Sequence, residues 1–422
     1  MMRPLTFNRR ALLAAAAAMT VAPLGRAEEA PGTEETRLWL EQGRYLPLLT
    51  FYRDLAETDP AMSWMAAQLA AMAGDEDAAF ELPPAPTLPP LDLTGCRTAD
   101  ALDTIVAAAR NRQIVILNEA HHASRCRAFA GLVAARLAGE GFSVFAAETF
   151  ANATRPSAAA EALNGGAPVT PALGWYLADP VYAETVRAAR RRGYRFAAYE
   201  ARAAQVAGTS GAQQLEARED GEANNFIADI LERNPKARVF VTCGYDHLRK
   251  AEAGDGRMWF AARLKAKTGI DPLCISQSWG VPPPDPAREP LALKAILDQF
   301  SPAAPVVVFD HNNEALRHSA PKAAVDLEVV HPRLAQVDGR PGWLAALPGR
   351  NKMRFTMPGL VDAYSVVQAV PAGENTAPNA VPSDQYPLKL GAREAVFFLT
   401  EGPYEIRLET DDGRSVLGQL KV

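Results

Sequence analysis

The segment Ile114-Val115-Ile116-Leu117-Asn118-Glu119-Ala120-His121-His122 joins an apolar run typical of a buried strand to acidic and imidazole side chains. Three later apolar runs, at residues 144–147, 194–199 and 238–242, also stop at polar groups. The groups that follow them are Glu148, Glu200 and the segment Cys243-Gly244-Tyr245-Asp246-His247. Amphipathic stretches of helical length separate the runs, which predicts strand–helix repeats and a largely parallel sheet. Because ligands bind beyond the carboxyl ends of such strands, we expect these polar groups to converge on one site.

The chain of 422 residues is 48% hydrophobic and 22% charged, a composition typical of a globular protein with a sizeable core. Its pattern divides it into an export signal, a helical hairpin, a proline-rich linker, an α/β domain and a β-rich C-terminal domain. The corresponding residues are 1–27, 28–81, 82–97, 98–353 and 354–422. The predicted fold class is α/β: a largely parallel central sheet flanked by helices, with an N-terminal helical hairpin and a small C-terminal β-rich unit.

Further elements follow from the same patterns. The hairpin helices are expected at residues 34–57 and 61–73, and further strands of the sheet at 271–276, 305–309 and 325–330. Short β-type runs in the C-terminal domain occupy residues 364–370, 395–400, 404–409 and 416–422. Asp310 and His311 follow one of the sheet strands, and we expect them to border the same site if that strand is parallel to its neighbours.

The first 27 residues have the pattern of an export signal. Arg9 and Arg10 precede an apolar stretch at residues 11–24, and Gly25-Arg26-Ala27 forms a small-residue cleavage site before Glu28. The paired arginines favour the twin-arginine route, and an ordinary secretory signal with two adjacent arginines is the alternative. Both routes predict a periplasmic protein.

The net charge and the hydropathy of the chain limit the kinds of partner that we expect it to bind. The net charge is −5 and the only cluster of basic residues is Arg190-Arg191-Arg192 on a predicted helix, so nothing favours nucleic-acid binding. No run after the signal is long and apolar enough to span a bilayer, so we expect no transmembrane segment in the mature chain. A small-molecule or peptide substrate is the expected partner.

Glu119 can act with either of the two histidines that follow it. If a helix begins near Glu119, then Glu119, His122 and Cys126 share one face. If the turn is extended, Glu119 pairs with His121 instead. Both pairings place a carboxylate beside an imidazole, where it orients the ring and raises its basicity. Cys126 is interpreted as a packed cysteine rather than a metal ligand.

The groups after the other strands suggest acid–base and anion-binding roles. Glu148 follows phenylalanine and alanine residues, so we expect partly apolar surroundings and a raised pKa, or else an ion pair with Arg218. Arg218 begins a predicted helix at residues 218–233 and could hold a substrate carboxylate or an oxyanion, or pair with Glu222. Gly244 would let the backbone approach a ligand closely beside His247.

Together these motifs, in this order between residues 114 and 247, resemble the erythromycin-esterase-like and ChaN-like superfamily, to which the Tiki proteases are related. The helical segment Arg218-Glu219-x-x-Glu222-Ala223-Asn224-Asn225 is part of the resemblance. In the esterase-like branch, the resemblance implies the catalytic residues Glu119, His122, Glu148 and His247. In the ChaN-like branch it selects His121 in place of His122. The substrate-binding candidates are His121, Arg218, Glu200 and Tyr245.

The first functional hypothesis is a periplasmic hydrolase of the ester, lactone or peptide type. His122 would take a proton from water, Glu119 would orient the imidazole, and Glu148 and His247 would bind or protonate the reacting group. A divalent metal ion held by His122, Glu148 and His247 could assist. The sequence contains no Gly-x-Ser-x-Gly elbow, phosphate loop or His-Glu-x-x-His motif, so serine hydrolases, nucleotide-binding proteins and zincins have no support.

Two alternatives belong to other functional classes. A haem- or iron-binding protein of the ChaN-like kind would use His121, His247 or Tyr245 as iron ligands. A binding module with a degenerate site is the second alternative. It rests on Asn118, where the family motif has glycine, and on Cys126, where the esterase-like pattern often has glutamate.

Overall fold

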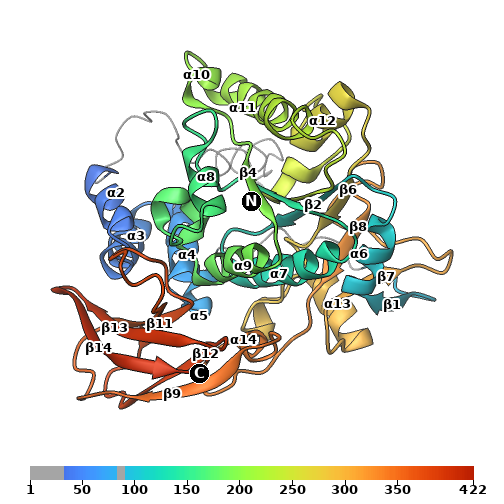
Figure 1. Ribbon diagram of the computed structural model, residues 1–422. Helices are drawn as coiled ribbons and strands as arrows, with labels where there is room; N and C mark the ends of the chain where they lie inside the picture. Colours follow the sequence, from blue (N-terminus) through green and yellow to red (C-terminus); the bar gives the residue numbers. More distant parts are fainter. Residues whose placement is uncertain (1–32, 83–90) are drawn as a thin grey trace, which may run out of the picture.

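An eight-stranded sheet forms the centre of the computed structural model, which describes residues 33–82 and 91–422 (Figure 1). Its strands lie in the order β1-β7-β8-β6-β2-β5-β3-β4. Their bounds are β1 Arg97–Asp100, β2 Ile114–Glu119, β3 Val144–Ala147, β4 Arg195–Ala198, β5 Val239–Gly244, β6 Leu273–Ser276, β7 Val306–Phe309 and β8 Leu327–Val330. The six strands from β8 to β4 are parallel, which confirms the predicted α/β fold class.

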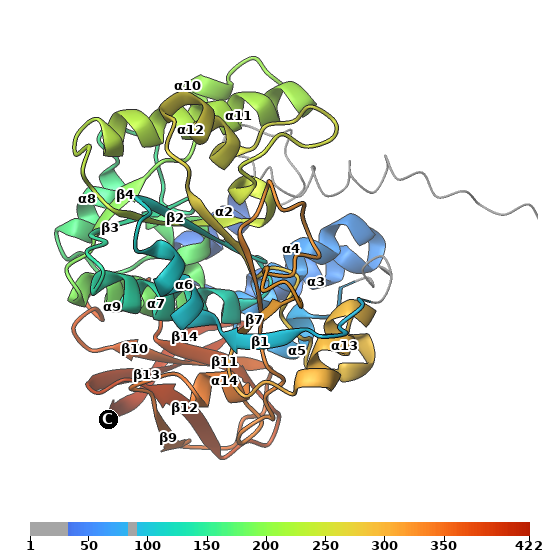
Figure 2. The ribbon, with the colours of Figure 1, turned by 90° about the vertical axis from the view of Figure 1, so that its right-hand side faces the viewer.

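Strand β7 runs antiparallel to both of its neighbours, β1 and β8. Figure 2 shows β1 and β7 side by side. Asp310 and His311 therefore follow β7 at the edge of the sheet opposite to the carboxyl ends of the parallel strands. The expectation that these two residues border the site assumed a parallel strand, and it is wrong.

Helices cover both faces of the sheet (Figure 1). One face packs against α6 Ala101–Ala109, α7 Ser124–Ala138 and α9 Pro180–Arg191, and the other against α11 Gly211–Phe226 and α12 Phe260–Thr268. Alternate residues of β2 point to opposite faces, so Val115 and Leu117 join the first core while Ile114 and Ile116 join the second. Burial on both faces explains why these strands read as continuous apolar runs in the sequence.

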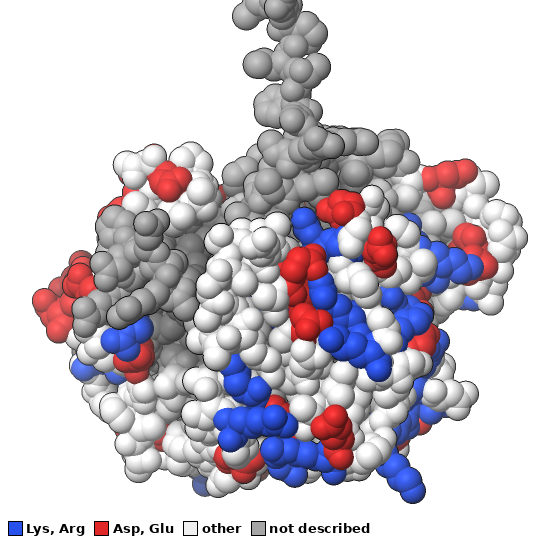
Figure 3. All heavy atoms as spheres, turned by 90° about the horizontal axis from the view of Figure 1, so that it is seen from above, with Lys and Arg blue, Asp and Glu red and all other residues white. Residues whose placement is uncertain are grey.

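The outer face of α11 and α12 carries interspersed acidic and basic side chains (Figure 3). Asp220 of α11 pairs with Lys267 of α12 at 2.8 Å and with Arg263 at 3.4 Å. Exposed pairs of this kind each contribute less than about 1 kcal/mol. The apolar inner faces of the two helices, rather than these pairs, therefore hold them on the sheet.

A helical unit precedes the sheet and a β-rich unit follows it, as the fold class predicted. The helical unit comprises α2 Thr33–Glu41, α3 Leu46–Thr58, α4 Ser63–Met72 and α5 Glu76–Ala79. The β-rich unit has a four-stranded antiparallel sheet in the order β11-β10-β13-β14 and a separate pair, β12-β9. Its strands are β9 Asn351–Thr356, β10 Ser365–Pro371, β11 Asp384–Leu388, β12 Glu394–Leu399, β13 Pro403–Thr410 and β14 Gly413–Lys421.

The two units contact each other through Glu409 of β13. Its buried carboxylate accepts hydrogen bonds from the backbone N–H groups of Tyr45 and Leu46, both at 3.1 Å, and from Arg44 at 3.0 Å. Tyr45 is the N-cap residue of α3 and supplies no capping side chain of its own. Glu409 therefore satisfies backbone donors at the start of α3 that would otherwise lack a partner.

Shorter elements complete the described part of the chain. They are α8 Ala158–Asn164, α10 Ala203–Val206, α13 Leu291–Phe300, α14 Gly342–Ala345, the π-helix Ile227–Leu231, and the 3-10 helices Pro60–Met62, Pro171–Leu173, Trp175–Ala178, Tyr245–Leu248 and Pro286–Arg288. Among the described residues, no helix combines the length and the apolar character needed to cross a membrane. The predicted export signal at residues 1–27, and residues 83–90 of the predicted linker, lie outside the described ranges.

Candidate functional site

The polar groups that the sequence singles out follow four neighbouring strands, β2, β5, β3 and β4. Glu119 is the last residue of β2, Glu148 follows β3 and Glu200 comes shortly after β4. His247 lies in the 3-10 helix after β5, and Arg218 reaches it from α11. Because these side chains are largely buried, the charges on them interact more strongly than they would in water.

His121, Glu119 and Arg127 form a buried chain of hydrogen bonds. Nδ1 of His121 lies 3.0 Å from Oε1 of Glu119. Arg127 of α7 donates to the same carboxylate from Nε at 3.1 Å and from Nη2 at 2.7 Å. Burial raises the pKa of Glu119, but the charge of Arg127 and the contact with His121 outweigh burial and hold that pKa below its ordinary value. Glu119 is therefore ionised, and because a carboxylate can only accept, Nδ1 of His121 carries the ring proton.

Two tyrosines fix the orientation of the His121 ring. Tyr176 is stacked on it, with ring centroids 4.1 Å apart and an interplanar angle of 14°. Tyr245 meets it edge-on at 4.9 Å, and the Tyr245 hydroxyl accepts a hydrogen bond from the backbone N–H of His121 at 3.3 Å. Within residues 33–82 and 91–422, Nε2 of His121 has no hydrogen-bond partner. This nitrogen is therefore available to accept a proton.

Nε2 of His121 faces Gly244 and Glu148. A Cβ atom on residue 244 would lie 2.5 Å from Nε2 of His121 and 3.4 Å from Oε2 of Glu148, so only glycine fits here. The backbone N–H of Gly244 donates to Oε2 of Glu148 at 2.6 Å. Because Gly244 has no side chain, its backbone lies close to the imidazole of His121 and the carboxylate of Glu148.

Glu148 lies between two cationic groups. Arg218 donates to its Oε1 at 2.8 Å, and Nε2 of His247 lies 3.8 Å from the same oxygen. Burial raises the pKa of Glu148, but the charges of His247 and Arg218 outweigh burial and hold that pKa well below its ordinary value. Of the two alternatives expected from the sequence, the ion pair with Arg218 is confirmed and the raised pKa is wrong. Glu148 stays ionised and acts as a hydrogen-bond acceptor.

Arg218 connects the remaining carboxylates. It donates to Glu200 from Nε at 2.9 Å and from Nη2 at 2.6 Å, and it pairs with Glu222 at 3.2 Å. Its Nη1 lies 3.1 Å from Nε2 of His247. Burial raises the pKa of Glu200 to about 7, with Arg218 opposing the shift and Glu222 adding to it. Arg218 therefore holds several glutamates in place as well as facing an imidazole.

His247 forms a second imidazole–carboxylate pair. Its Nδ1 lies 2.9 Å from Oε1 of Glu219 and 3.5 Å from Oε2 of Glu222, and Trp259 meets the ring edge-on at 5.7 Å. Burial lowers the pKa of His247, but the carboxylates of Glu219, Glu148 and Glu222 outweigh burial and raise it well above its ordinary value. His247 is therefore cationic at neutral pH, whereas Nε2 of His121 remains open.

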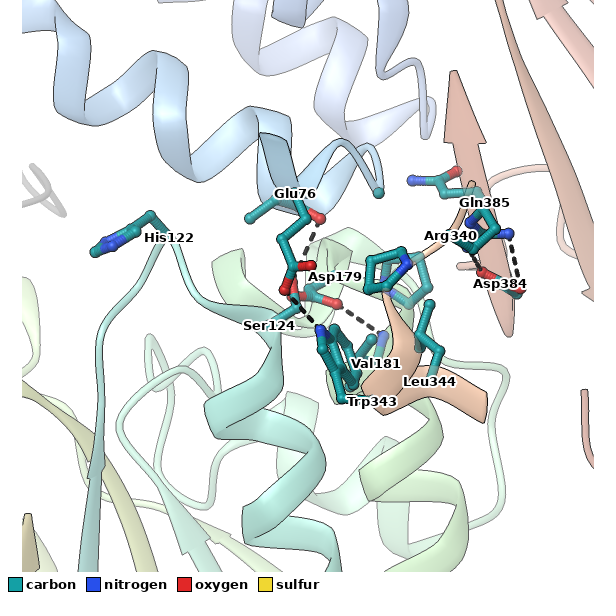
Figure 4. A pocket seen from close by; sticks show the side chains of 14 residues that line it. Glu76, His122, Ser124, Asp179, Val181, Arg340, Trp343, Leu344, Asp384 and Gln385 are labelled. Atoms are coloured by element: carbon teal, nitrogen blue, oxygen red, sulfur yellow. Dashed lines mark hydrogen bonds and ion pairs between the residues drawn. The ribbon is translucent and has the colours of Figure 1, made fainter. Parts of the chain in front are cut away.

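His122 points away from this cluster. It meets Trp64 edge-on at 5.9 Å and Phe80 at 5.0 Å, and its buried Nδ1 has no hydrogen-bond partner. Burial lowers its pKa to about 4, with His121 and Arg127 adding to the shift. His122 lines a small cavity with residues that include Glu76, Ser124 and Asp179, and it stands apart from them (Figure 4).

The local backbone explains why the two histidines separate. Glu119 ends β2, and α7 begins only at Ser124, so a turn rather than a helix contains both histidines. The expectation that Glu119, His122 and Cys126 share one helical face is therefore wrong. Cys126 is buried, and burial raises its pKa to about 12, so it is a packed thiol as interpreted from the sequence.

A divalent ion fits a donor set that differs from the predicted one. Among the described residues, ligand atoms of Glu219, Glu222 and His247 lie within 4.8 Å of one another. Both carboxylate oxygens of Glu222 are buried and make no hydrogen bond in the described chain. Two carboxylates and an imidazole suit a divalent cation. Of the predicted ligands, only His247 belongs to this set, and His122 lies elsewhere.

Two of the three predicted iron ligands, His247 and Tyr245, contact other groups of the protein. A Cβ on residue 244 would lie 2.5 Å from Nε2 of His121, so the imidazole lies close to the Gly244 backbone. Arg218 lies 3.1 Å from Nε2 of His247. The Tyr245 hydroxyl is engaged by the backbone of His121.

Three residues of the site, Arg127, Glu219 and Tyr176, have no role that was expected from the sequence. Arg127 could have been recognised from the sequence, because it lies in the first turns of a helix. A positive charge is unfavourable there unless a nearby negative charge compensates it. The carboxylate of Glu119, at the end of β2, is the negative charge that Arg127 pairs with. Glu219 stands beside Arg218 in the helical motif, but nothing in the spacing shows that it faces His247.

Comparisons with known proteins give a limited likeness. No family model matches the chain, and no curated protein matches it. Among solved structures, the type III effector HopBA1 aligns over 59% of this chain and 98% of its own, with 14% identity and a TM-score of 0.34. A bacterial protein toxin aligns over 43% of this chain and 37% of its own, with 16% identity and a TM-score of 0.32. RRSP, a MARTX toxin effector domain from Vibrio vulnificus, aligns over 43% of this chain and 36% of its own, with 18% identity and a TM-score of 0.30.

Proposed function

We propose that this protein is a periplasmic hydrolase of the ester, lactone or peptide type in which His121 is the general base. The observation that carries the proposal is the Glu119–His121 contact of 3.0 Å, which leaves Nε2 open toward Glu148 and Gly244. A histidine that acts as general base needs one ring nitrogen without a hydrogen-bond partner and a ring held in one orientation, beside an acceptor that can bind water. Glu119 holds the ring in that orientation, and Glu148 is the acceptor.

The first step is the removal of a proton from water. Nε2 of His121 takes the proton while the water oxygen attacks the carbonyl carbon of the substrate. Glu119 then stabilises the imidazolium, as the carboxylate of a catalytic triad does. Arg127 keeps Glu119 ionised, and the ring of Tyr176 keeps the imidazole in its plane.

The second step is the collapse of the tetrahedral intermediate. His247 is cationic and stands beside Arg218, so the pair favours the developing oxyanion, and His247 can donate a proton to the leaving group. Glu148 and Glu200 hold the Arg218 guanidinium in position. Tyr245 has a positioning role, because its hydroxyl contacts the backbone of His121.

Glu219, Glu222 and His247 would hold a divalent ion if the hydrolase uses one. Such an ion would supply Lewis-acid polarisation of a carbonyl oxygen. His121 would keep its role, because its Nε2 lies outside this donor set, whereas His247 would be a neutral ligand and the ion would take over its role as the cation.

The test compares the two histidines in the mature protein, residues 28–422. Activated esters such as p-nitrophenyl acetate and butyrate, a panel of lactones and a casein-derived peptide mixture are the probes. We expect His121→Ala to lower the rate on the hydrolysed probe by a factor on the order of 10²–10⁴. His122→Ala, at the adjacent position, is the matched control and should keep the rate. Full activity in His121→Ala would refute the proposal, as would a failure of every probe with and without added divalent metal.

A further inference from the structure

A cavity of about 120 Å³ opens beside β4, the edge strand of the central sheet, away from the candidate site. Its apolar lining includes Val144, Ala160, Phe196, Ala197, Ala198 and Ile230. A dry apolar cavity of about 150 Å³ is large enough to bind benzene. The volume beside β4 therefore suits one small ring or a short aliphatic group.

The rim of this cavity carries surplus positive charge. Asp229 accepts close hydrogen bonds from Arg155 at 2.7 Å and from Arg202 at 2.6 Å, so its charge is already compensated. Arg233 lies 3.7 Å from Asp229, beyond hydrogen-bond distance. Arg195, on the same rim, is likewise 3.7 Å from its nearest carboxylate, that of Glu161.

The donors of both rim arginines are available. In the part of the chain that the structure describes, neither the Arg195 nor the Arg233 guanidinium makes a hydrogen bond. A guanidinium presents a planar set of N–H groups that matches a carboxylate. The rim thus offers two unused carboxylate-binding groups above an apolar floor.

The backbone around the cavity argues for a small molecule rather than a peptide strand. The side-chain amide of Asn164 already bonds the outward N–H and C=O groups of Phe196, at 2.8 and 3.0 Å. This blocks the addition of another strand to β4. Asp229 and Ile230 lie in a π-helix, Ile227–Leu231, a rare conformation that is frequent at functional sites.

We propose that this cavity binds a small monocarboxylate with an aromatic or short aliphatic body. The apolar body packs against the floor formed by β4 and Ala160, and the carboxylate is held by Arg195 and Arg233. The inference is independent of the hydrolase proposal, because none of these residues belongs to the Glu119–His121 or Glu219–His247 pairs.

The experiment is isothermal titration calorimetry on the mature protein with three probes. Benzoate carries both the ring and the charge, benzyl alcohol carries the ring alone, and inorganic phosphate carries charge alone. We expect saturable one-site binding of benzoate, and binding at least about tenfold weaker for each of the other two probes. No saturable benzoate binding, or phosphate binding as tight as benzoate, would overturn the proposal.

Variants separate this site from nonspecific binding. Arg195→Ala with Arg233→Ala should weaken benzoate binding at least about tenfold, and Ala160→Leu should abolish it by filling the floor. The matched control is Arg53→Ala, because Arg53 is 57% exposed and also sits 3.7 Å from its carboxylate partner. Unchanged benzoate affinity in the arginine double variant would contradict the assignment. Thermal unfolding of each variant verifies that it is folded, and the arginine pair, being partly exposed, keeps the test valid if Ala160→Leu does not fold.

Discussion

Nδ1 of His121 lies 3.0 Å from Oε1 of Glu119, although only Ala120 separates the two residues in the chain. The two residues are close in the sequence, but the residues that hold the Glu119 carboxylate in place come from other parts of the chain. Arg127 reaches the carboxylate from α7 and also donates to Oδ2 of Asp179, the N-cap residue of α9, at 2.5 Å. The geometry of the imidazole therefore depends on a strand end and two helices together.

Arg127→Gln should destabilise the protein by about 3–5 kcal/mol, because it leaves Glu119 and Asp179 as buried carboxylates without their shared cation. Urea unfolding measures the difference. Arg136→Gln on the same helix is the control, since Arg136 is 48% exposed and pairs with an exposed Asp103. Its cost should stay below about 1 kcal/mol. Equal losses in the free energy of unfolding for the two variants would contradict the role of Arg127 as the shared cation of Glu119 and Asp179.

His122 should make stability depend on pH between 6.5 and about 4. Its pKa in the folded protein is lowered to about 4, so the unfolded chain binds its proton first as the pH falls. The stabilising effect is complete above pH 6.5 and is lost as the pH falls toward 4, by up to about 3 kcal/mol. His122→Phe keeps an aromatic ring against Trp64 and Phe80 and removes the titration. Parallel stability–pH curves for the two proteins would exclude this role.

Glu409→Ala should cost about 1–2 kcal/mol in the free energy of unfolding, because two backbone donors at the start of α3 lose their acceptor. Hydrogen exchange should become faster at the amides of Tyr45 and Leu46 in particular. Glu401→Ala, at an exposed position of the same unit, is the control and should change neither quantity. Unchanged exchange at Tyr45 in the Glu409 variant would show that another group caps the helix.

The export signal gives a prediction about the first residues. Intact mass of the periplasmic form should correspond to a chain that begins at Glu28. Replacing both Arg9 and Arg10 by lysine should stop export through the twin-arginine route. Export of the double variant at the normal level would point to the ordinary secretory route instead.

The sequence predicted the strands that form apolar runs and missed three strands that do not. Because β2, β3 and β5 are buried on both faces, their sequences are continuous apolar runs that can be recognised as strands. β1 has the sequence Arg97-Thr98-Ala99-Asp100 at the edge of the sheet, and β9 is largely exposed, so neither shows an apolar run. β11 contains Pro387, which argues against a strand in a sequence pattern.

The sequence predicted where in the fold the site lies. It did not predict which of the two histidines faces the site, or the direction of the pKa shift of Glu148. Glu119, Glu148 and His247 could be singled out because each follows an apolar run. The choice between His121 and His122 depends on where α7 begins, and Ala123 at its N-cap position gives no capping signal. The low pKa of Glu148 arises from His247 and Arg218; the pair with Arg218 was one of the expected alternatives, but no local pattern reveals that His247 also lies near this carboxylate.

The contact between Glu409 and the start of α3 also sets a time scale for synthesis. The Tyr45 amide and its acceptor are 364 positions apart in the chain. At about 5–20 residues per second, a ribosome needs roughly 20–70 s to travel that distance. During this interval the first helices are made but the carboxylate that completes α3 does not yet exist. The N-terminal helical unit thus reaches its final state only when nearly the whole polypeptide has been translated.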